Sequence, residues 1–444
     1  MTLETRDSFY ALADELLGRR REGEEMRLSF QGEESDFVRF NNAAIRQPGS
    51  VRQLHLSMEL IRGKRHCRAH VVLSGDRALD GSRLRDVLER LRVDLGSLPE
   101  DPYLILPDDP RSTEQVGEDR LPKAEEAVEE ILDAASGTDF VGIFASGGLF
   151  KGFASSLGQK SWFSSHPFNL DFSIYAHEDK ALKESLAGLE WNGATLRERL
   201  GWAREKLPIL DRPPKDISPG GYRVFLAPAA MEEILNVLSY NGFGLRSHRS
   251  KTTSLLRLLE NEAALSPEVT LTESTKRGLG PSFDDSGFVC PDEVRLIEGG
   301  KLTGALVSPR SAVEYDVPTN AASSGEHPRS LEMAPGDIAK DDVLEKLGEG
   351  ILIGNLWYLN YSDLKNCRMT GMTRFGTFWV EGGQIVAPAP AMRFDESVYR
   401  MLGDNLEGLT REQELIMDPS TYSARSTNSA RVPGAIVRDF TLTL

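Results

Sequence analysis

Two histidine-containing segments have the residue types of a metal site, but neither has the spacing that one requires. His66 and His70 share a face of a predicted strand, where a rise of about 3.3 Å per residue places them about 13 Å apart. One zinc ion binds nitrogen at about 2.0–2.1 Å and cannot bridge them, so we interpret this surface as a solvated strand face. His177 and Glu178 begin "HEDKALKESL", in which Ala181 stands where the zincin pattern has its second histidine. We interpret that segment as an ordinary transition from a loop into a helix.

Two further charged segments could bind ions or exchange protons. His248 lies in "GLRSHRSKTT", a basic cluster that could bind an anion, a peptide carboxylate or an acidic partner surface. A solvated loop is the alternative that we favour for this segment. Asp284 and Asp285 form a carboxylate pair in "PSFDDSGF" that could hold a cation or act in acid–base catalysis. Adjacent acids before Ser-Gly are typical of turns, and we predict a turn here.

The composition disfavours several classes of function. The net charge of −16 opposes nucleic-acid binding, because the phosphates would repel the chain. The three cysteines lie too far apart in the sequence to indicate a disulfide framework or a structural zinc site. No apolar run approaches the roughly 18–20 residues that span a bilayer, and the first residues lack the pattern of a secretory signal. We therefore expect a cytoplasmic protein without a membrane or nucleic-acid partner.

The amino-terminal residues are predicted to combine helices with antiparallel strands. Apolar periodicity predicts helices at 5–18 and 84–95 and separate strands at 26–30 and 37–40. The clearest pattern is a hairpin at 53–73, in which apolar and polar residues alternate on both sides of a Gly-Lys turn. Its register pairs Leu60 with Cys67 and sets Glu59 opposite Arg68, a favourable cross-strand pair.

Proline-rich breaks divide the predicted elements. Residues 97–122 carry five prolines among acidic residues, and "LPILDRPPKDISPGG" forms a second break. The later half has short apolar runs separated by Gly and Pro, with hairpin turns expected at "EGGK" and "EGGQ". We predict an α+β fold, with amino-terminal α/β units and antiparallel hairpins followed by a mostly antiparallel β domain. The predicted parts are an amino-terminal α+β domain (1–97), a linker (98–122), a middle α+β region (123–215) and a β-rich carboxy-terminal domain (216–444).

Several segments, taken in order and spacing, resemble the TldD/PmbA family of metallopeptidase-related proteins. The resemblance covers most of the chain and is strongest in its second half. It is carried by "FASGGLFKGFASSLGQKSWFSSHPFNLDFSIYA" (144–176), "FDDSGFVCPDEVRLIEGGKLTGALVSPRSA" (283–312), "VPTNAA" (317–322), "MTGMTRFGTFWVEGGQIVAPAPAMRFDES" (369–397) and "DPSTYSARSTNSARVPGAIVRDFTLTL" (418–444).

In the catalytic branch of that family, a helix carries His-Glu-x-x-x-His, which binds a metal and supplies a general base. Here a predicted strand, Tyr222–Leu226, leads into a predicted helix, Met231–Leu238. The resemblance places Asn236 at the first histidine, Val237 at the glutamate and Asn241 at the second histidine. The chain is thus similar to the family without carrying the residues of its chemistry.

The family's third metal ligand is a cysteine near the carboxy-terminus, and in this chain no cysteine follows Cys367. Amide side chains bind zinc poorly beside imidazole and thiolate. The resemblance therefore implies the non-catalytic TldE/PmbA branch, with no catalytic residue and no metal of its own, since zinc belongs to the catalytic branch. It also implies a homodimer, or a heterodimer with a TldD-type subunit, that acts on unfolded or modified peptides. An active metallopeptidase with rearranged ligands and a stand-alone peptide-binding or scaffold protein are the alternatives.

A peptide groove is expected to persist in the β-rich half, because an extended peptide binds a strand edge through main-chain hydrogen bonds. Four polar residues of the family-like segments could line it, or could instead hold turns and hairpins together: Asn320, Tyr361, Arg374 and Ser423. Arg374 is the preferred candidate, because Phe375 and Trp379 can bury and leave its guanidinium free to bind a carboxylate. We also expect dimerisation through this half, whose many short strands leave edges that need cover.

Overall fold

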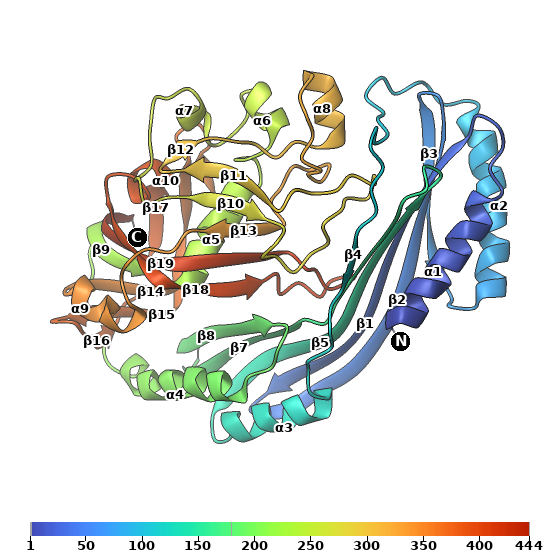
Figure 1. Ribbon diagram of the computed structural model, residues 1–444. Coiled ribbons are helices and arrows are strands. Elements are labelled where there is room, and N and C mark those ends of the chain that lie inside the picture. The colour runs from blue at the N-terminus through green and yellow to red at the C-terminus, as the bar shows by residue number, and fades with distance from the viewer. Residues whose placement is uncertain (1, 179, 444) are drawn as a thin grey trace.

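The computed structural model describes residues 2–178 and 180–443, which form two large sheets with helices packed on them (Figure 1). The strands of the first sheet are β1 (Glu25–Asn41), β2 (Ala44–Arg62), β3 (Arg65–Leu73), β4 (Glu114–Val116), β5 (Asp139–Ser155), β6 (Lys160–Ser165), β7 (Phe168–His177) and β8 (Lys180–Gly188). Their order is β3-β2-β1-β5-β6-β4, and the first half of β5 pairs with β7, which pairs with β8. The sheet is therefore long, with β7 and β8 at one end.

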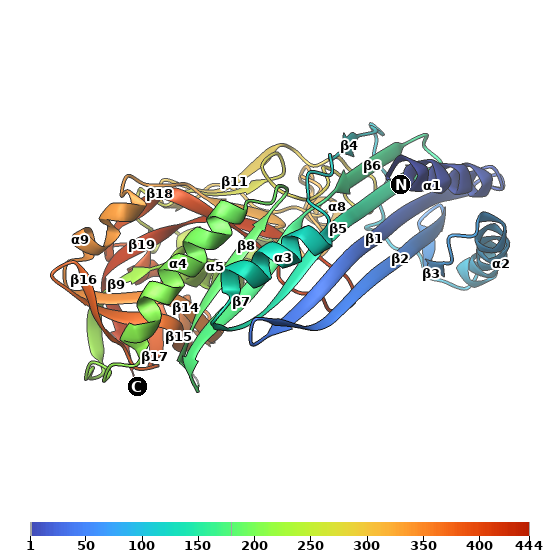
Figure 2. The same cartoon turned by 90° about the horizontal axis from the view of Figure 1, so that it is seen from below.

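Four helices cover one face of this sheet (Figure 2): α1 (Thr2–Leu17), α2 (Arg77–Leu95), α3 (Ala124–Ala135) and α4 (Gly193–Leu210). The even-numbered apolar residues of β1 point toward them. Leu28 and Phe30 belong to the core under α1 and α2, and Val38 and Phe40 to the core under α3 and α4. Because side chains alternate along a strand, the odd-numbered residues of β1 face the second half of the chain.

The second sheet contains β9 (Gly220–Leu226), β10 (Leu271–Ser274), β11 (Glu293–Glu298), β12 (Lys301–Leu302), β13 (Ser330–Met333), β14 (Gly350–Asp363), β15 (Arg368–Glu381), β16 (Gln384–Pro388), β17 (Arg393–Ser397), β18 (Leu406–Met417) and β19 (Ser429–Leu442). Its order is β12-β11-β10-β13-β19-β17-β15-β14-β9, and most pairs are antiparallel. Because β9 also pairs with β19, the strands β19, β17, β15, β14 and β9 form a closed circuit.

The helices of the second half are α5 (Pro228–Ser239), α6 (Leu245–Arg249), α7 (Leu256–Leu259), α8 (Pro309–Tyr315), the 3₁₀ turn η1 (Lys340–Asp342), α9 (Val343–Leu347) and α10 (Val398–Met401). The apolar face of α5 joins the core of the second sheet. In the part of the chain that the structure describes, no helix combines the length and apolarity needed to cross a membrane.

The predicted α+β class is confirmed, as is the hairpin register that sets Glu59 opposite Arg68. The turns expected at "EGGK" and "EGGQ" join β11 to β12 and β15 to β16. The separate strands predicted at 26–30 and 37–40 are wrong, because both belong to the single strand β1. The polar residues between them stay in the ladder, since β1 pairs there with both β2 and β5. The division of the chain into four parts stays a prediction.

The loop before β19 anchors the second half to the first sheet. Arg425 is buried, and its backbone N–H donates to Glu33 Oε2 at 3.2 Å while its guanidinium donates to the Pro167 carbonyl at 2.6 Å. Gln53 Nε2 donates both to Glu33 and to the Ser423 carbonyl at 2.7 Å. Burial lowers the pKa of Arg425 to about 10, with Glu33 opposing the change. The loop is therefore fixed by a buried polar network.

Candidate functional site

A cavity of about 960 Å³ lies where the two halves meet. The first half lines it with residues of β7, β8 and α4, and the second half with residues of α5, β14 and β18. Figure 2 shows α4, α5, β7 and β8 together at this junction. Ligand pockets in proteins span about 300–1,000 Å³, so the cavity has the size of a binding site for a peptide segment.

Helix α5 divides its residues between the core and this cavity. Pro228 begins the helix, where its missing backbone N–H leaves no intrahelical bond unmade. The side that packs into the core carries Ala230, Met231, Ile234, Leu235 and Leu238. Glu232, Glu233 and Asn236 line the cavity, and their spacing of three and four residues keeps them on one side of the helix.

Glu232 and Glu233 give the cavity its unusual electrostatics. Neither carboxylate forms a hydrogen bond or an ion pair with any described residue. Withdrawal from bulk water raises the pKa of Glu232 to about 7; Glu233 and Asp418 add to the rise, and Lys183 opposes it. Burial also raises the pKa of Glu233, against the attraction of Lys183. Glu232 can therefore exchange a proton near neutral pH.

Other carboxylates around the cavity form ion pairs with basic side chains. Lys183 Nζ lies 3.4 Å from Asp171 Oδ2. Arg199 of α4 contacts Glu184 at 2.8 Å and Glu414 at 2.9 Å, and so bridges the two halves. Burial alone would lower the pKa of Arg199, but Glu414 and Glu184 raise it. These pairs leave the carboxylates of α5 as unmatched negative charge.

Arg329 is a cavity residue whose guanidinium contacts no carboxylate in the described part of the chain. It donates to Cys290 Sγ at 3.0 Å, while the backbone N–H of Arg329 donates to Glu273 Oε1 at 3.1 Å. Burial raises the pKa of the Cys290 thiol, although Arg329 opposes the rise. Cys290 is therefore a buried neutral thiol, unlike the exposed, low-pKa thiolates of reactive cysteines.

The positions aligned with the metal motif lie at the end of α5 and beyond it. Asn236 lines the cavity, Val237 packs partly buried against the core, and Asn241 follows the end of the helix. Asn241 Nδ2 donates to the Thr252 carbonyl at 3.3 Å. Two amides and an aliphatic side chain do not fit a zinc ion. Among residues 2–178 and 180–443, no group of three or more His, Cys, Asp or Glu side chains is placed to hold a metal.

Cys367, the last cysteine, also lies away from this cavity. It is buried in the turn between β14 and β15, where burial raises the pKa of its thiol to about 12. It is not among the described residues that line the cavity. A neutral thiol in that position is a core residue.

Two of the four residues expected in a peptide groove, Asn320 and Tyr361, use their side chains for hydrogen bonds within the protein. Asn320 Oδ1 accepts from the Val307 N–H at 2.8 Å, and its amide also donates to a carbonyl at 2.8 Å. Tyr361 donates its hydroxyl to the Val237 carbonyl at 3.2 Å. Ser423 is exposed in the loop that Arg425 anchors. The described residues that line the cavity include none of these three, so the structure does not bring them together.

Arg374 lies nearer to the cavity. Its guanidinium stands 4.5 Å from the ring centroid of Trp357 and 4.9 Å from that of Phe375. It forms no ion pair with any described residue. Its cross-strand partner, Asn355, lines the cavity, so Arg374 lies beside the rim. Trp379 is buried and Phe375 partly buried, and the guanidinium remains available to a ligand.

The structure corrects three interpretations of histidine segments. His66 is only partly solvated, because its Nδ1 lies 2.7 Å from Glu59 Oε1, while His70 on the same face is exposed as predicted. The residues after His177 form strand β8, since they pair with β7 instead of beginning a helix. His248 is buried in α6, and its Nε2 lies 2.7 Å from the Gly242 carbonyl. Burial lowers the pKa of His248, although that carbonyl opposes the change.

The turn predicted at Asp284 is confirmed. Its Oδ1 accepts from the N–H groups of Ser286 and Phe288 at 2.9 and 2.8 Å. Burial raises the pKa of Asp284 to about 6, although these two hydrogen bonds oppose the rise. The carboxylate is thus occupied by its own turn.

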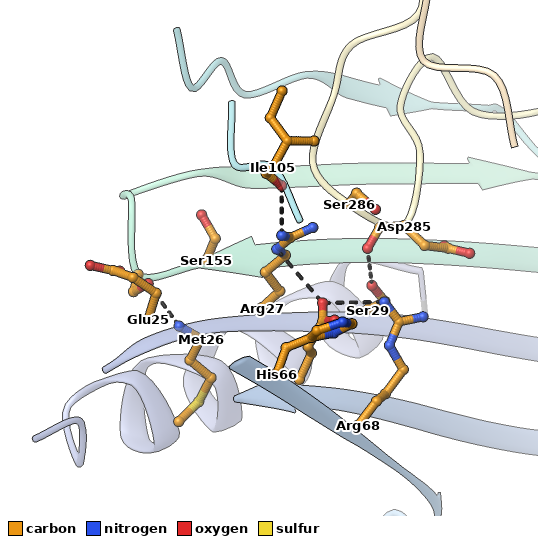
Figure 3. Close-up of polar contacts among 12 residues, drawn as sticks. Glu25, Met26, Arg27, Ser29, His66, Arg68, Ile105, Ser155, Asp285 and Ser286 are labelled. Atoms are coloured by element: carbon orange, nitrogen blue, oxygen red, sulfur yellow. Dashed lines mark hydrogen bonds and ion pairs between the residues drawn. The ribbon is translucent and has the colours of Figure 1, made fainter. Parts of the chain in front are cut away.

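We call the group of Arg27, Glu59, His66 and Arg68 the Glu59 ion cluster. Figure 3 shows its three basic members, Arg27, His66 and Arg68. Arg68 donates to Glu59 at 3.2 Å, and Arg27 Nε lies 3.7 Å from the same carboxylate. Arg27 also donates to the Ile105 carbonyl at 2.8 Å (Figure 3). Burial alone would raise the pKa of Glu59, but Arg27, Arg68 and His66 outweigh it and lower the pKa. Arg27 and Glu59 are buried at its centre, and His66 and Arg68 cover them from the surface, which favours a structural role.

The sequence interpretation missed the charged residues of the cavity. Glu232 and Glu233 could have been found, because they interrupt the apolar pattern of the family-like helix on one side. Asn169 and Asp171 of β7 carry no such local signal. They reach the cavity only because the two sheets meet, which no local pattern describes.

Comparisons with known proteins agree with this arrangement. Residues 219–444 match a family described as the PmbA/TldA metallopeptidase C-terminal domain. No curated protein sequence matches the chain significantly. TldE from Thermococcus kodakarensis is 15% identical with a TM-score of 0.78, and the match covers 98% of this chain and all of that one.

Two further structures share the fold. A proposed modulator of a DNA gyrase from Thermotoga maritima is 14% identical with a TM-score of 0.77, over 98% of this chain and 100% of that one. A proposed modulator of DNA gyrase from Bacteroides thetaiotaomicron is 17% identical with a TM-score of 0.70, over 99% of both chains. At these identities the likeness concerns the fold. The family match spans half of the sequence, with α5 and its cavity-facing carboxylates inside it, and the chain therefore belongs to the TldD/PmbA family of peptidase-related proteins.

Proposed function

We propose that this chain is a non-catalytic, peptide-binding subunit of a cytosolic peptidase complex that acts on unfolded or modified peptides. The observation that carries the proposal is the construction of α5. It stands beside a cavity of about 960 Å³, while the positions aligned with the family's metal motif hold Asn236, Val237 and Asn241. The helix lies beside a cavity but lacks the side chains that could act as zinc ligands.

The lining of the cavity suits a peptide segment. Apolar side chains from both halves, Trp202 and Phe225, share the walls with polar groups such as Asn355. Binding sites commonly combine apolar walls with a few polar groups that orient the ligand. The stand-alone peptide-binding protein rests on the same observation, because one chain builds the whole cavity.

A TldD-type partner would supply the metal chemistry in the proposed complex. The shared fold with TldE from Thermococcus kodakarensis supports this assignment, and a homodimer is the alternative assembly. Trp357 and Tyr358 of β14 are 48% and 81% exposed in the β-rich half. Aromatic side chains are enriched in protein interfaces, which supports dimerisation through this half.

The test measures zinc content, peptide binding and peptide cleavage for the isolated chain and for its mixture with a TldD-type subunit of the same organism. We expect no stoichiometric zinc and no cleavage by the isolated chain, together with binding of an unfolded peptide. The mixture should form a stable complex that cleaves the peptide. About one zinc per chain, lost together with activity on chelation, would contradict the proposal and favour a metallopeptidase with rearranged ligands.

A further inference from the structure

We infer that the cavity recognises a primary ammonium group, held by the carboxylates of Glu232 and Glu233 and the amide of Asn169. This inference rests on the proposed function, because it names the chemical group by which the cavity would select its peptides. It depends on three features of the described residues: the charge of the cavity, a buried polar side chain without a partner, and the match between these groups and an ammonium ion.

At α5 the cavity carries negative charge without a close cationic partner, whereas the guanidinium of Arg329 donates to Cys290 Sγ. Lys183 and Arg199 are engaged by carboxylates of β7, β8 and β18, at 2.8–3.4 Å. Glu232 and Glu233 contact no cation among the described residues, and they stand next to each other on the helix. A ligand cation entering the cavity would relieve the repulsion between these two carboxylates.

Asn169 supplies the second, independent feature. It is only 6% exposed, it lines the cavity, and its amide forms no hydrogen bond with any described residue. Buried amides are normally hydrogen-bonded, so an unpartnered one facing a cavity indicates a missing ligand or water. Asp171, two residues further on the same side of β7, lines the same cavity as Glu232 and Glu233 of α5. Strand β7 and helix α5 therefore face each other across the cavity.

An ammonium group fits these side chains better than other cations do. It has three N–H donors and no acceptor, and the two carboxylates and one amide oxygen provide acceptors for all three donors, with five oxygens in all. No group of three or more His, Cys, Asp or Glu side chains among the described residues is placed to hold a metal, so Glu232 and Glu233 would offer a divalent ion only two carboxylates. A guanidinium presents its five donors in one rigid plane, whereas the side chains of Glu232 and Glu233 leave the helix in directions about 100° apart, which suits the rotatable donors of an ammonium group better. The peptide could offer its free amino terminus or a lysine side chain.

The experiment compares matched peptides by isothermal titration calorimetry. One pair differs only in acetylation of the amino terminus, and a second pair differs only in lysine against norleucine. The parent chain should bind the peptide with the free ammonium group at least about tenfold more tightly. The preference should disappear in the double variant Glu232→Gln, Glu233→Gln, while the control Glu129→Gln, an exposed glutamate of α3, keeps it.

The four outcomes separate the inference from the proposed function. A preference that follows the amino terminus supports the inference and identifies that source, and one that follows lysine supports it with the side chain as the source. Equal binding of all peptides overturns the inference and leaves peptide binding intact. Absence of binding by every peptide overturns the proposed function as well. Thermal unfolding of each variant, and Asn169→Asp as a variant that should strengthen ammonium binding, keep the test valid if one substitution impairs folding.

Discussion

Glu59 and Glu232 are two carboxylates withheld from bulk water at opposite ends of the first sheet's inner side, and their surroundings differ sharply. Glu59 is 3% exposed and receives Arg68, His66 and Arg27. Glu232 is partly buried in the cavity and receives no partner from the described residues. The pKa of Glu59 is accordingly lowered, although burial opposes this, and that of Glu232 is raised to about 7.

The difference separates a charge that supports the fold from a charge that is free to act. A buried carboxylate with several cationic partners is stabilised by contacts within the protein, and removing it leaves those partners unpaired. A carboxylate that faces a cavity without partners is less stable in its ionised form than it would be in water. Such perturbed groups are typical of binding and catalytic sites. A glutamate therefore stabilises the fold in the first place and is available to a ligand in the second.

The largest expected effect comes from removing the charge that supports the fold. Glu59→Gln should lower the free energy of unfolding by about 3 kcal/mol, because Arg27 remains buried without its counter-ion. Denaturant unfolding at neutral pH measures this value. Glu129→Gln, which removes an exposed charge from α3, should change it by less than about 0.5 kcal/mol. Equal stabilities for the two variants would mean that the Glu59 ion cluster does not support the fold.

A smaller effect of opposite sign is expected at the free carboxylate. Glu232→Gln should raise the free energy of unfolding by about 1–2 kcal/mol at a pH of about 8, because the neutral amide avoids an unpaired charge beside Glu233 and Asp418. The gain stays below the full value of the pKa shift, since Glu232 is partly exposed and Lys183 attracts it. Unfolding free energies of both proteins at this pH test the sign. A loss of stability in the variant would show that Glu232 has a cationic partner after all.

The pH dependence of the two carboxylates should also run in opposite directions. The pKa of Glu232 is raised in the folded state, so its contribution is fully present below the unfolded value of about 4.5 and is lost as pH rises through about 7. The pKa of Glu59 is lowered, so its contribution is present above about 4.5 and is lost as pH falls through its folded pKa. Glu232→Gln should therefore reduce the loss of unfolding free energy that occurs as the pH rises above about 5. Glu59→Gln should reduce the loss of unfolding free energy that occurs at more acid pH.

How far sequence could predict this molecule follows from the range of the interactions. The hairpin around Glu59 was predictable because alternation and turn residues fix its register locally. The contacts of His66 and His248 were not, because the Glu59 carboxylate and the Gly242 carbonyl come next to them only in the folded structure. The same holds for the cavity, which depends on the meeting of β7 with α5. The family-like helix was found from sequence, but its cavity-facing carboxylates were overlooked beside the motif positions.

The smallest effect on stability is expected at Arg374, which shares features of both kinds of charge. Its stacking on Trp357 and Phe375 at 4.5 and 4.9 Å resembles a structural contact, yet no described carboxylate neutralises it. An exposed cation–π contact contributes about 0.5–1 kcal/mol, so Arg374→Ala should lower the free energy of unfolding by less than about 1 kcal/mol. If its guanidinium binds a peptide carboxylate at the rim, the variant should also lose several-fold in peptide affinity.

Arg46→Ala, which removes an exposed arginine of β2, is the control for net charge. A variant that unfolds would make Arg374 a structural residue, and one that binds peptide as well as the parent would exclude it from the site. A loss of affinity at nearly unchanged stability would place Arg374 with Glu232, among the charges that the fold leaves free for a ligand.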